Sequence, residues 1–192
     1  MSFDDLTDNT KSLRNIPGAK YIEHIAEFLQ NKNEENILRQ ARELLLKYKF
    51  MEHSFVTRQL NTQKKIPELT DALRVVKTFQ KKKQMGKNKN LVTLFPVEES
   101  LYAKGIIEKF DNIMLWLGAN VMVEFTFNEA INLLNQHLQR AINLFKELDE
   151  ELSWLHQQIC TTEINISRIH NYVEMKKGLK EKEADNKTEQ VN

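Results

Sequence analysis

His156 and Cys160 are the two side chains best spaced for metal chemistry, because residues four apart lie on one face of a helix. A zinc site needs four ligands, or three ligands and a water molecule, and Cys160 is the single cysteine of the chain. Both residues also fall at outward-facing positions of a heptad pattern, so we interpret them as surface residues and expect no metal site. The other histidines are not grouped with carboxylates, as acid–base catalysis would require: His24, His53, His137 and His170.

Residues 81–90, KKKQMGKNKN, could contact nucleic acid or another protein. The chain carries 28 Lys+Arg and 27 Asp+Glu, so its net charge of +1 provides no field that would attract a phosphate backbone. A leucine-zipper DNA-binding protein needs a basic helix continuous with its heptads, and Gly86 and Asn90 interrupt this stretch. The glycines are isolated and no Gly-Lys-Ser/Thr occurs, which argues against a phosphate-binding loop. We expect a solvated loop, no nucleic-acid partner, no cofactor and no enzymatic activity.

The composition indicates long helices. The 192 residues include only 5 Gly and 3 Pro, where ordinary usage would give roughly 13 and 10. A Gly-rich α/β enzyme and an all-β sandwich are therefore disfavoured. The single cysteine excludes an internal disulfide and suits a reducing compartment. Because no apolar run approaches the ~20 residues of a membrane span, and residues 1–10 lack the features of a signal peptide, we expect a cytoplasmic protein with no membrane partner. A nuclear role stays open.

A helical pattern runs from about residue 19 to residue 84, and residues 1–18 are expected to form a flexible tail. With Leu38 at heptad position a and Ala41 at position d, nine of the thirteen seam positions are apolar. Most of the polar seam residues lie in the middle of this stretch, close to Pro67. Proline removes a helical hydrogen bond and clashes with the preceding turn, so we predict a kink or a short break near residue 66.

Residues 85–125 are expected to form a β-rich insert. Four short apolar runs are typical of strands: residues 91–95, 103–107, 113–117 and 121–125. Gly118 and Asn120 separate the last two runs, which predicts a hairpin. The runs are continuously apolar, and this predicts burial on both faces. Open strand edges invite pairing, so the insert is expected to associate with other chains.

A second helix, residues 126–175, is predicted by a capping box in which Thr126 is the N-cap and Glu129 reaches back to it. Its seam is apolar through six heptads with one polar exception, Thr162, and so strict a seven-residue period makes a left-handed coiled coil. Trp154 lies off the seam. It could contact a neighbouring subunit or simply be an exposed surface residue, and the sequence favours neither alternative. Residues 176–192 are expected to be a disordered tail.

The predicted fold is mainly α: a long antiparallel coiled-coil helical hairpin with two small β-hairpins inserted between the helices. The insert reverses the direction of the chain, so the two helices lie seam to seam. Both termini then lie at the end of the coil away from the insert.

Within this layout several stretches resemble prefoldin, in particular its α-type subunits and among them the subunit-3 group. They are IPGAKYIE at residues 16–23, KYKFME at 47–52, KIPE at 65–68, LYAK at 101–104, LWLGANVM at 115–122 and TTEIN at 161–165. The hairpin at residues 116–122 is the most specific of them, and the resemblance covers about residues 16–175. Residues 81–90 and the start of the second helix at Thr126 and Phe127 depart from the family's pattern.

The resemblance implies a heterohexamer of two α-type and four β-type subunits, with this chain as one of the α-type subunits. Such a complex is an ATP-independent holding chaperone that captures unfolded actin and tubulin and delivers them to the cytosolic group II chaperonin. The alternative function is a structural coiled-coil tether or scaffold, which would need only a turn at residues 113–125.

Two sets of residues are predicted to carry this function. The hairpin would supply a subunit interface: Leu115, Trp116, Leu117, Gly118, Val121 and Met122. The end of the coil that holds the termini would contact the client where its helices splay: Tyr21, Ile22, Ile25, Phe28, Leu29, Ile166, Ile169, Tyr172 and Val173. For each residue of the second set, closing the seam of the coil is the simpler explanation.

Overall fold

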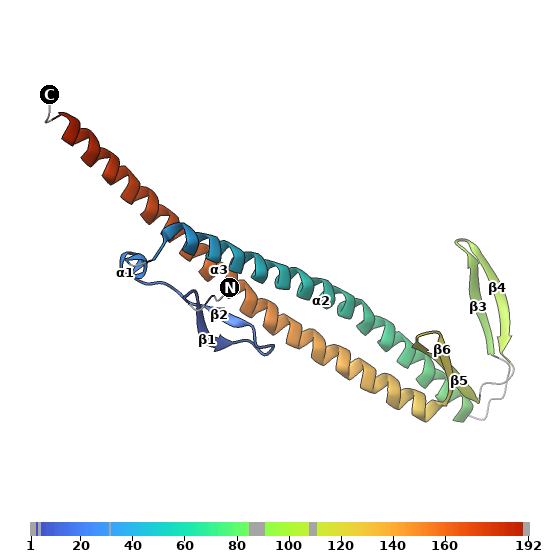
Figure 1. The fold of residues 1–192 in the computed structure, drawn as a ribbon. Helices are drawn as coiled ribbons and strands as arrows, with labels where there is room; N and C mark the ends of the chain where they lie inside the picture. Colours follow the sequence, from blue (N-terminus) through green and yellow to red (C-terminus); the bar gives the residue numbers. More distant parts are fainter. Residues whose placement is uncertain (1–2, 4, 31, 85–90, 108–110, 190–192) are drawn as a thin grey trace. The chain divides into compact units, whose positions relative to one another are not determined.

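The computed structural model describes residues 3, 5–30, 32–84, 91–107 and 111–189. Its main elements are two long helices, α2 (Glu34–Gln84) and α3 (Phe127–Glu189), with two β-hairpins between them in the chain (Figure 1). The chain divides into two compact units. Unit 1 comprises Met1–Leu60 with Lys146–Asn192, and unit 2 comprises Asn61–Phe145. Each unit contains a part of both long helices, and the predicted mainly α class is confirmed.

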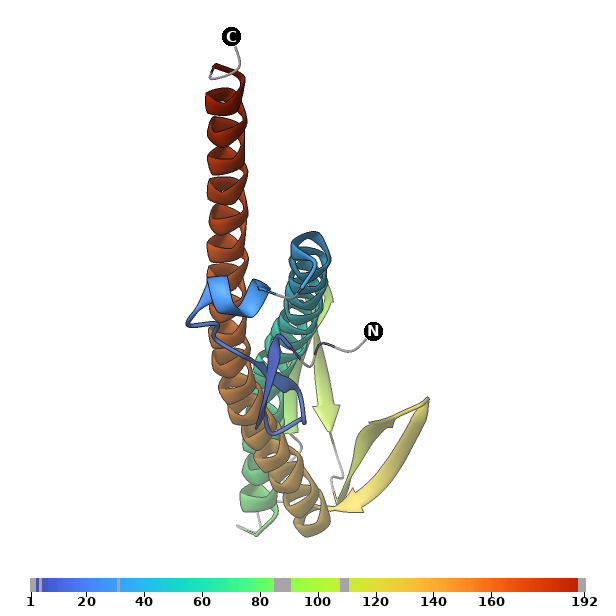
Figure 2. The same ribbon diagram turned by 60° about the vertical axis from the view of Figure 1, so that its left-hand side comes forward.

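The two long helices are antiparallel, as predicted (Figure 2). In unit 1, Lys176 near the end of α3 places its Nζ 2.5 Å from Oε1 of Glu34, the first residue of α2. In unit 2, Gln80 near the end of α2 donates from Nε2 to Oδ1 of Asn128, at the start of α3, over 2.6 Å. In unit 1, Gln59 of α2 also donates from Nε2 to Oδ1 of Asp149 in α3 over 3.1 Å, so residue numbers rise along α2 as they fall along α3.

The predicted d positions of α2 are confirmed, since Ala41, Tyr48 and Val76 are all buried. In unit 1, however, Ile37 and Leu44 are buried in place of the predicted a residues Leu38 and Leu45, which are only partly buried. The predicted break near residue 66 is wrong, because α2 continues through Pro67 without interruption. Both Pro67 and Gln63, whose carbonyl loses its helical donor, are exposed. Water can therefore replace the hydrogen bond that proline removes.

The helix α2 ends at Gln84, where the helical pattern was predicted to end, whereas α3 extends further than predicted. Residues 81–84 belong to α2, and the three lysines of its last turn suit the negative end of the helix dipole. Residues 85–90, the rest of the predicted loop, lie outside the described residues. The helix α3 continues to Glu189, so the predicted disordered tail from residue 176 is wrong up to that point, and residues 190–192 are again outside the described residues. Lys and Glu dominate residues 176–189 and are good helix formers.

The structure places strands where a flexible N-terminal tail was predicted. Strand β1 (Thr7–Lys11) pairs antiparallel with β2 (Pro17–Ala19), and the short helix α1 (Ile25–Leu29) follows. Because α2 begins only at Glu34, residues 19–33 are not the start of one long helix, as had been expected.

Apolar burial explains why the N-terminal residues are ordered. Leu6 and Ile16 are buried in the hydrophobic cluster of unit 1, and each such side chain contributes roughly 1.5–3 kcal/mol. Gly18 allows the two strands to approach closely, since a Cβ at this position would lie 2.1 Å from Oγ1 of Thr10.

The predicted β-rich insert consists of two separate antiparallel hairpins, which confirms the fold prediction. The first joins β3 (Leu91–Glu98) to β4 (Leu101–Ile107), and the second joins β5 (Asn112–Gly118) to β6 (Val121–Thr126). The second turn uses positive φ at three successive residues: Gly118 (95°), Ala119 (48°) and Asn120 (62°). Burial on both faces, which was predicted, is not found in the single chain, because each sheet has only two strands and most of its side chains are exposed.

The predicted capping box opens α3. The main-chain N–H and the hydroxyl of Thr126 donate to Oε2 of Glu129 over 3.0 and 2.8 Å, and the N–H of Glu129 donates back to the Thr126 hydroxyl over 3.4 Å. These hydrogen bonds lower the pKa of Glu129. Directly after this cap begins the buried core of unit 2, which comprises Leu73, Val76, Phe127, Ala130 and Leu134.

Candidate functional site

The structure gives the His156 and Cys160 pair no further ligand. Cys160 is exposed, and Nδ1 of His156 lies 3.9 Å from Oε1 of Glu52. Among the described residues, no three His, Cys, Asp or Glu side chains come together as metal ligands would. No helix in the described part of the chain is long and apolar enough to cross a bilayer.

The residues predicted to contact a client come together in one hydrophobic cluster of unit 1, as the antiparallel arrangement requires. Five of them are buried: Ile22, Ile25, Leu29, Ile169 and Val173. Three more are partly buried against the cluster: Phe28, Ile166 and Tyr172. Tyr21 is exposed, with the Arg168 guanidinium 5.0 Å from its ring centre. Because most of these side chains are covered, they can reach a client only if this part of the unit opens.

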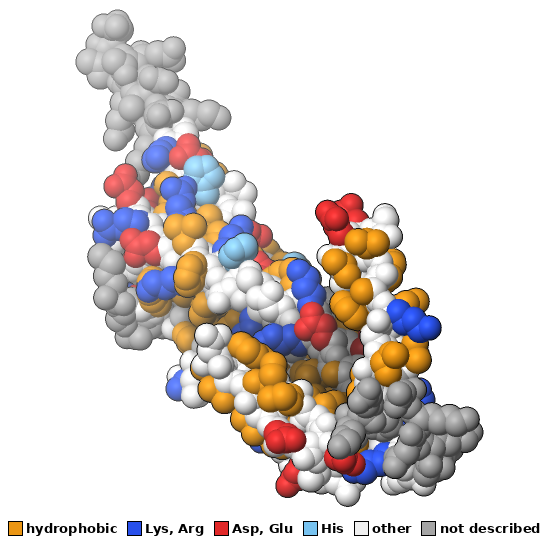
Figure 3. All heavy atoms as spheres, turned by 90° about the vertical axis from the view of Figure 1, so that its right-hand side faces the viewer, with side chains coloured by type: hydrophobic (Ala, Val, Ile, Leu, Met, Phe, Trp, Pro, Cys, Tyr) orange, Lys and Arg blue, Asp and Glu red, His pale blue; other side chains and the backbone are white. Residues whose placement is uncertain are grey.

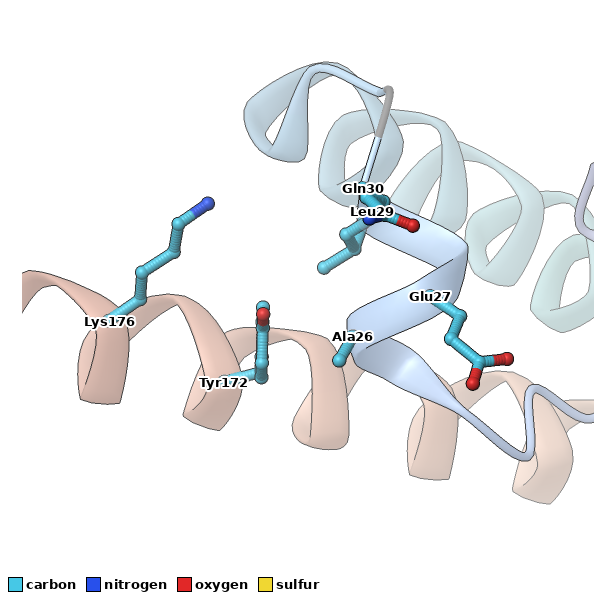
Figure 4. Close-up of a pocket in the computed structure, with 6 residues that line it drawn as sticks. All are labelled: Ala26, Glu27, Leu29, Gln30, Tyr172 and Lys176. Carbon is cyan, nitrogen blue, oxygen red and sulfur yellow. The ribbon is translucent and has the colours of Figure 1, made fainter.

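The contact between α1 and α3 illustrates this packing. Ala26 and Leu29 lie on the side of α1 that faces Tyr172 of α3, and together they line a shallow pocket (Figure 4). Lys176 lies at its rim, and the hydrogen bond from Lys176 to Glu34 raises the pKa of the ammonium. The predicted client residues of α1 and α3 therefore cover one another.

A row of polar side chains on α3, which the sequence analysis missed, holds the N-terminal segment in place. We call Glu151, Gln158 and Asn165 the α3 ladder, and they are spaced seven residues apart beside the apolar seam. The N–H of Arg14 donates to Glu151 Oε1 over 2.9 Å, and the N–H of Ala19 donates to Gln158 Oε1 over 2.8 Å.

Asn165 completes the ladder with two bonds. Its Oδ1 accepts from the N–H of Ile22 over 3.1 Å, and its Nδ2 donates to the carbonyl of Lys20 over 2.7 Å. Two further side chains bind carbonyls of the same segment. Tyr48 of α2 donates its hydroxyl to Pro17 over 2.7 Å, and Arg168 donates to Ile22 and Glu23. All of these contacts are made to main-chain atoms of residues 14–23, which we call the N-terminal segment.

One atom of the ladder has no partner. Glu151 is only 1% exposed, yet its Oε2 is buried without a hydrogen bond, and it is the single such side-chain atom among the described residues. Trp154, one turn further along α3, is partly buried against the cluster and lines a pocket with Ser12 and Leu13. Trp154 is therefore not an ordinary exposed surface residue, and its contact with a neighbouring subunit stays a prediction.

The predicted interface residues form an exposed apolar surface on the β5–β6 hairpin. Gly118 forms the turn, Leu115 is half-buried towards the core of unit 2, and the others are about half exposed: Trp116 58%, Leu117 48%, Val121 48% and Met122 51%. The β3–β4 hairpin exposes Leu94, Phe95, Tyr102 and Ile106 to similar degrees. These side chains belong to the hydrophobic surface of unit 2, and exposed hydrophobic groups are plain in Figure 3. Large apolar side chains left exposed at such density on two short hairpins indicate an interaction site.

Comparison with known proteins agrees with this arrangement. The family model of prefoldin subunits matches residues 48–172. Prefoldin subunit 3 of Homo sapiens is 34% identical over 175 residues, which cover 90% of this chain and 87% of that protein. The probable prefoldin subunit 3 of Schizosaccharomyces pombe is 37% identical over 159 residues, covering 83% and 90%. A chain of filamentous PFD from Methanocaldococcus jannaschii aligns with a TM-score of 0.48 and 17% identity, over 62% of this chain and 93% of that chain. The family match and the identity to these relatives show that the chain belongs to the prefoldin family.

Proposed function

We propose that this chain is an α-type subunit of a hexameric holding chaperone, together with one more α-type and four β-type subunits. The observation that carries the proposal is the exposed apolar surface of the two hairpins in unit 2. Pairing this surface with neighbouring hairpins would remove it from water. Each large side chain that becomes fully buried would stabilise the complex by roughly 1.5–3 kcal/mol. A tether or scaffold would need only a turn between α2 and α3, and its exposed hairpins would favour aggregation.

Client holding is proposed for the hydrophobic cluster of unit 1. Apolar contacts are not directional, so such a cluster accepts many sequences. Weak contacts on several subunits of one complex add through their effective concentration, so a client is held without a defined pocket and released without ATP. The resemblance to prefoldin supports unfolded actin and tubulin as clients, the group II chaperonin as the recipient, and the cytoplasm as the compartment.

Native mass spectrometry tests the assembly. The chain, tagged at its C-terminal end, would be purified from its own cells at low salt. We expect a complex of about six subunits that contains other small coiled-coil chains. A homodimer, or a complex with a single large partner, would instead favour the tether or scaffold.

A holding assay tests the activity. Actin diluted from urea should aggregate less in the presence of the reassembled complex, and equally so with and without ATP. The matched control is the set of partner subunits without this chain. Equal aggregation in the two samples would contradict a role for this chain in holding.

A further inference from the structure

The α3 ladder contacts main-chain atoms of the N-terminal segment and none of its side chains. Every residue except proline carries the same N–H and carbonyl groups. The ladder therefore recognises an extended chain irrespective of its sequence. Beside it, the hydrophobic cluster takes up the apolar side chain of Ile22 and those of Ile25 and Leu29, which belong to the short helix α1.

The geometry of the ladder suits an extended chain. Arg14, Ala19 and Ile22 meet Glu151, Gln158 and Asn165 in the same order, so the segment runs parallel to α3. Seven helical residues rise about 10 Å, and an extended chain covers this distance in about three residues, as it does between Ala19 and Ile22. The five residues from Arg14 to Ala19 cover the same rise because they include the turn at Asn15, whose φ is 60°. The extended part of the segment is therefore residues 19–22, which the ladder holds by three hydrogen bonds to main-chain atoms.

We propose that the α3 ladder and the adjoining cluster form a binding groove for an extended segment of a non-native polypeptide. In the free chain the groove is occupied by residues 14–29, which a client displaces. The inference rests on the proposed holding function and refines it. The side chains of Ile22, Ile25 and Leu29 belong to the occupant, whereas Ile169 and Val173 belong to the groove.

Two observations indicate that the occupant is exchangeable. The buried Oε2 of Glu151 receives no donor from the N-terminal segment, so a different chain that supplied one would satisfy the groove better. The occupant also has little structure of its own to hold it. It consists of strand β2, which pairs with β1 in a two-stranded sheet that is marginal in isolation, and the five-residue helix α1.

Hydrogen exchange on the reassembled complex tests the inference directly. The probe is reduced, carboxymethylated α-lactalbumin, which stays unfolded. We expect amides of residues 12–24 to exchange faster with the probe bound, on the order of tenfold, because the segment has left the ladder. Unchanged or slower exchange with the probe bound would overturn the inference and leave the proposed function standing. A complex that does not bind the probe at all would overturn both.

A variant of the occupant gives a second test, because displacement of the segment and direct contact with the client predict opposite changes in probe binding. Ile22→Ser with Ile25→Ser keeps the main-chain groups but weakens the apolar packing of the segment against the groove. The probe should therefore bind at least about tenfold more tightly to this variant than to the wild type. The control variant carries Leu46→Ser and Leu60→Ser, two exposed side chains of α2 in the same unit, and should bind within about twofold of the wild type. Weaker binding by the occupant variant would overturn the inference, since it would mean that Ile22 and Ile25 contact the client themselves. If this variant fails to assemble, the exchange experiment on the wild type still decides.

Discussion

Tyr48 shows how a single side chain joins separate parts of unit 1. It is a seam residue of α2 and only 1% exposed, and its hydroxyl donates to the carbonyl of Pro17. Burial raises the pKa of Tyr48 to about 12, and the nearby charge of Asp8 acts in the same direction. The phenol must stay neutral to donate this hydrogen bond. Deprotonation of Tyr48 at high pH would therefore remove one of the hydrogen bonds that hold the N-terminal segment.

Tyr48→Phe should cost about 1 kcal/mol of unfolding free energy at pH 7, because the Pro17 carbonyl loses its donor. The folded pKa of about 12 lies above the ordinary tyrosine pKa of 10.0, so the contribution of the hydroxyl is complete below pH 10 and is lost as the pH rises through 12. The difference between wild type and variant should therefore shrink over this range. Urea unfolding of the dilute chain, followed by circular dichroism, measures it.

Tyr102→Phe is the matched control, since Tyr102 is exposed on β4. It should leave the unfolding free energy within about 0.5 kcal/mol of the wild type. A difference between wild type and Tyr48→Phe that stayed constant up to pH 12 would show that the ionisation of Tyr48 is not coupled to folding.

At the scale of elements, the hairpins differ from the helices in what covers them. The long helices bury their seams against each other within each unit, whereas the hairpins are two-stranded and keep large apolar side chains in water. Trp116 and Met122 face each other across the β5–β6 register and are both more than half exposed. Removing these two side chains therefore takes little away from the fold of the single chain.

Trp116→Ser with Met122→Ser should abolish or greatly weaken assembly and leave the helical content unchanged. Native mass spectrometry reports the assembly and circular dichroism reports the helices. Phe50→Ser is the control, because Phe50 is a large side chain on α2 that is 76% exposed, and it should leave the complex intact. A double variant that assembled like the wild type would exclude these side chains from the interface.

At the scale of the whole molecule, the chain exposes more apolar surface than a monomer comfortably carries. Exposed large hydrophobic residues occur on both hairpins of unit 2, for example at Leu94 and Trp116. Patches of this kind either pair with a partner or lead to aggregation.

The isolated chain should therefore self-associate, whereas the chain produced together with its partner subunits should stay soluble. Size-exclusion chromatography with light scattering distinguishes the two, since a monomer has a mass of 22.7 kDa. A stable monomer at micromolar concentration would contradict the expectation that the hairpins need partners.

Patterns local in the sequence predicted most of the fold. The capping box at Thr126 and the heptads around Tyr48 depend on residues within one or two turns of each other, and the structure confirms both. The N-terminal segment was missed because its partners are distant in the chain: Arg14 and Glu151 are 137 residues apart. The seven-residue spacing of the α3 ladder was a usable signal, although polar side chains beside a seam are also typical of a solvated surface.

The contacts of the extreme N-terminus have a practical consequence for labelling the protein. The ammonium nitrogen of Lys47 lies over the ring of Phe3, 4.2 Å from the ring centre. The carboxylate of Asp5 forms an ion pair with the ammonium of Lys32 over 2.7 Å. A fluorescent protein or affinity handle fused ahead of Phe3 would be anchored against α2 and would strain these contacts. A reporter attached there would disturb the segment that it was meant to observe, so handles belong at the opposite terminus.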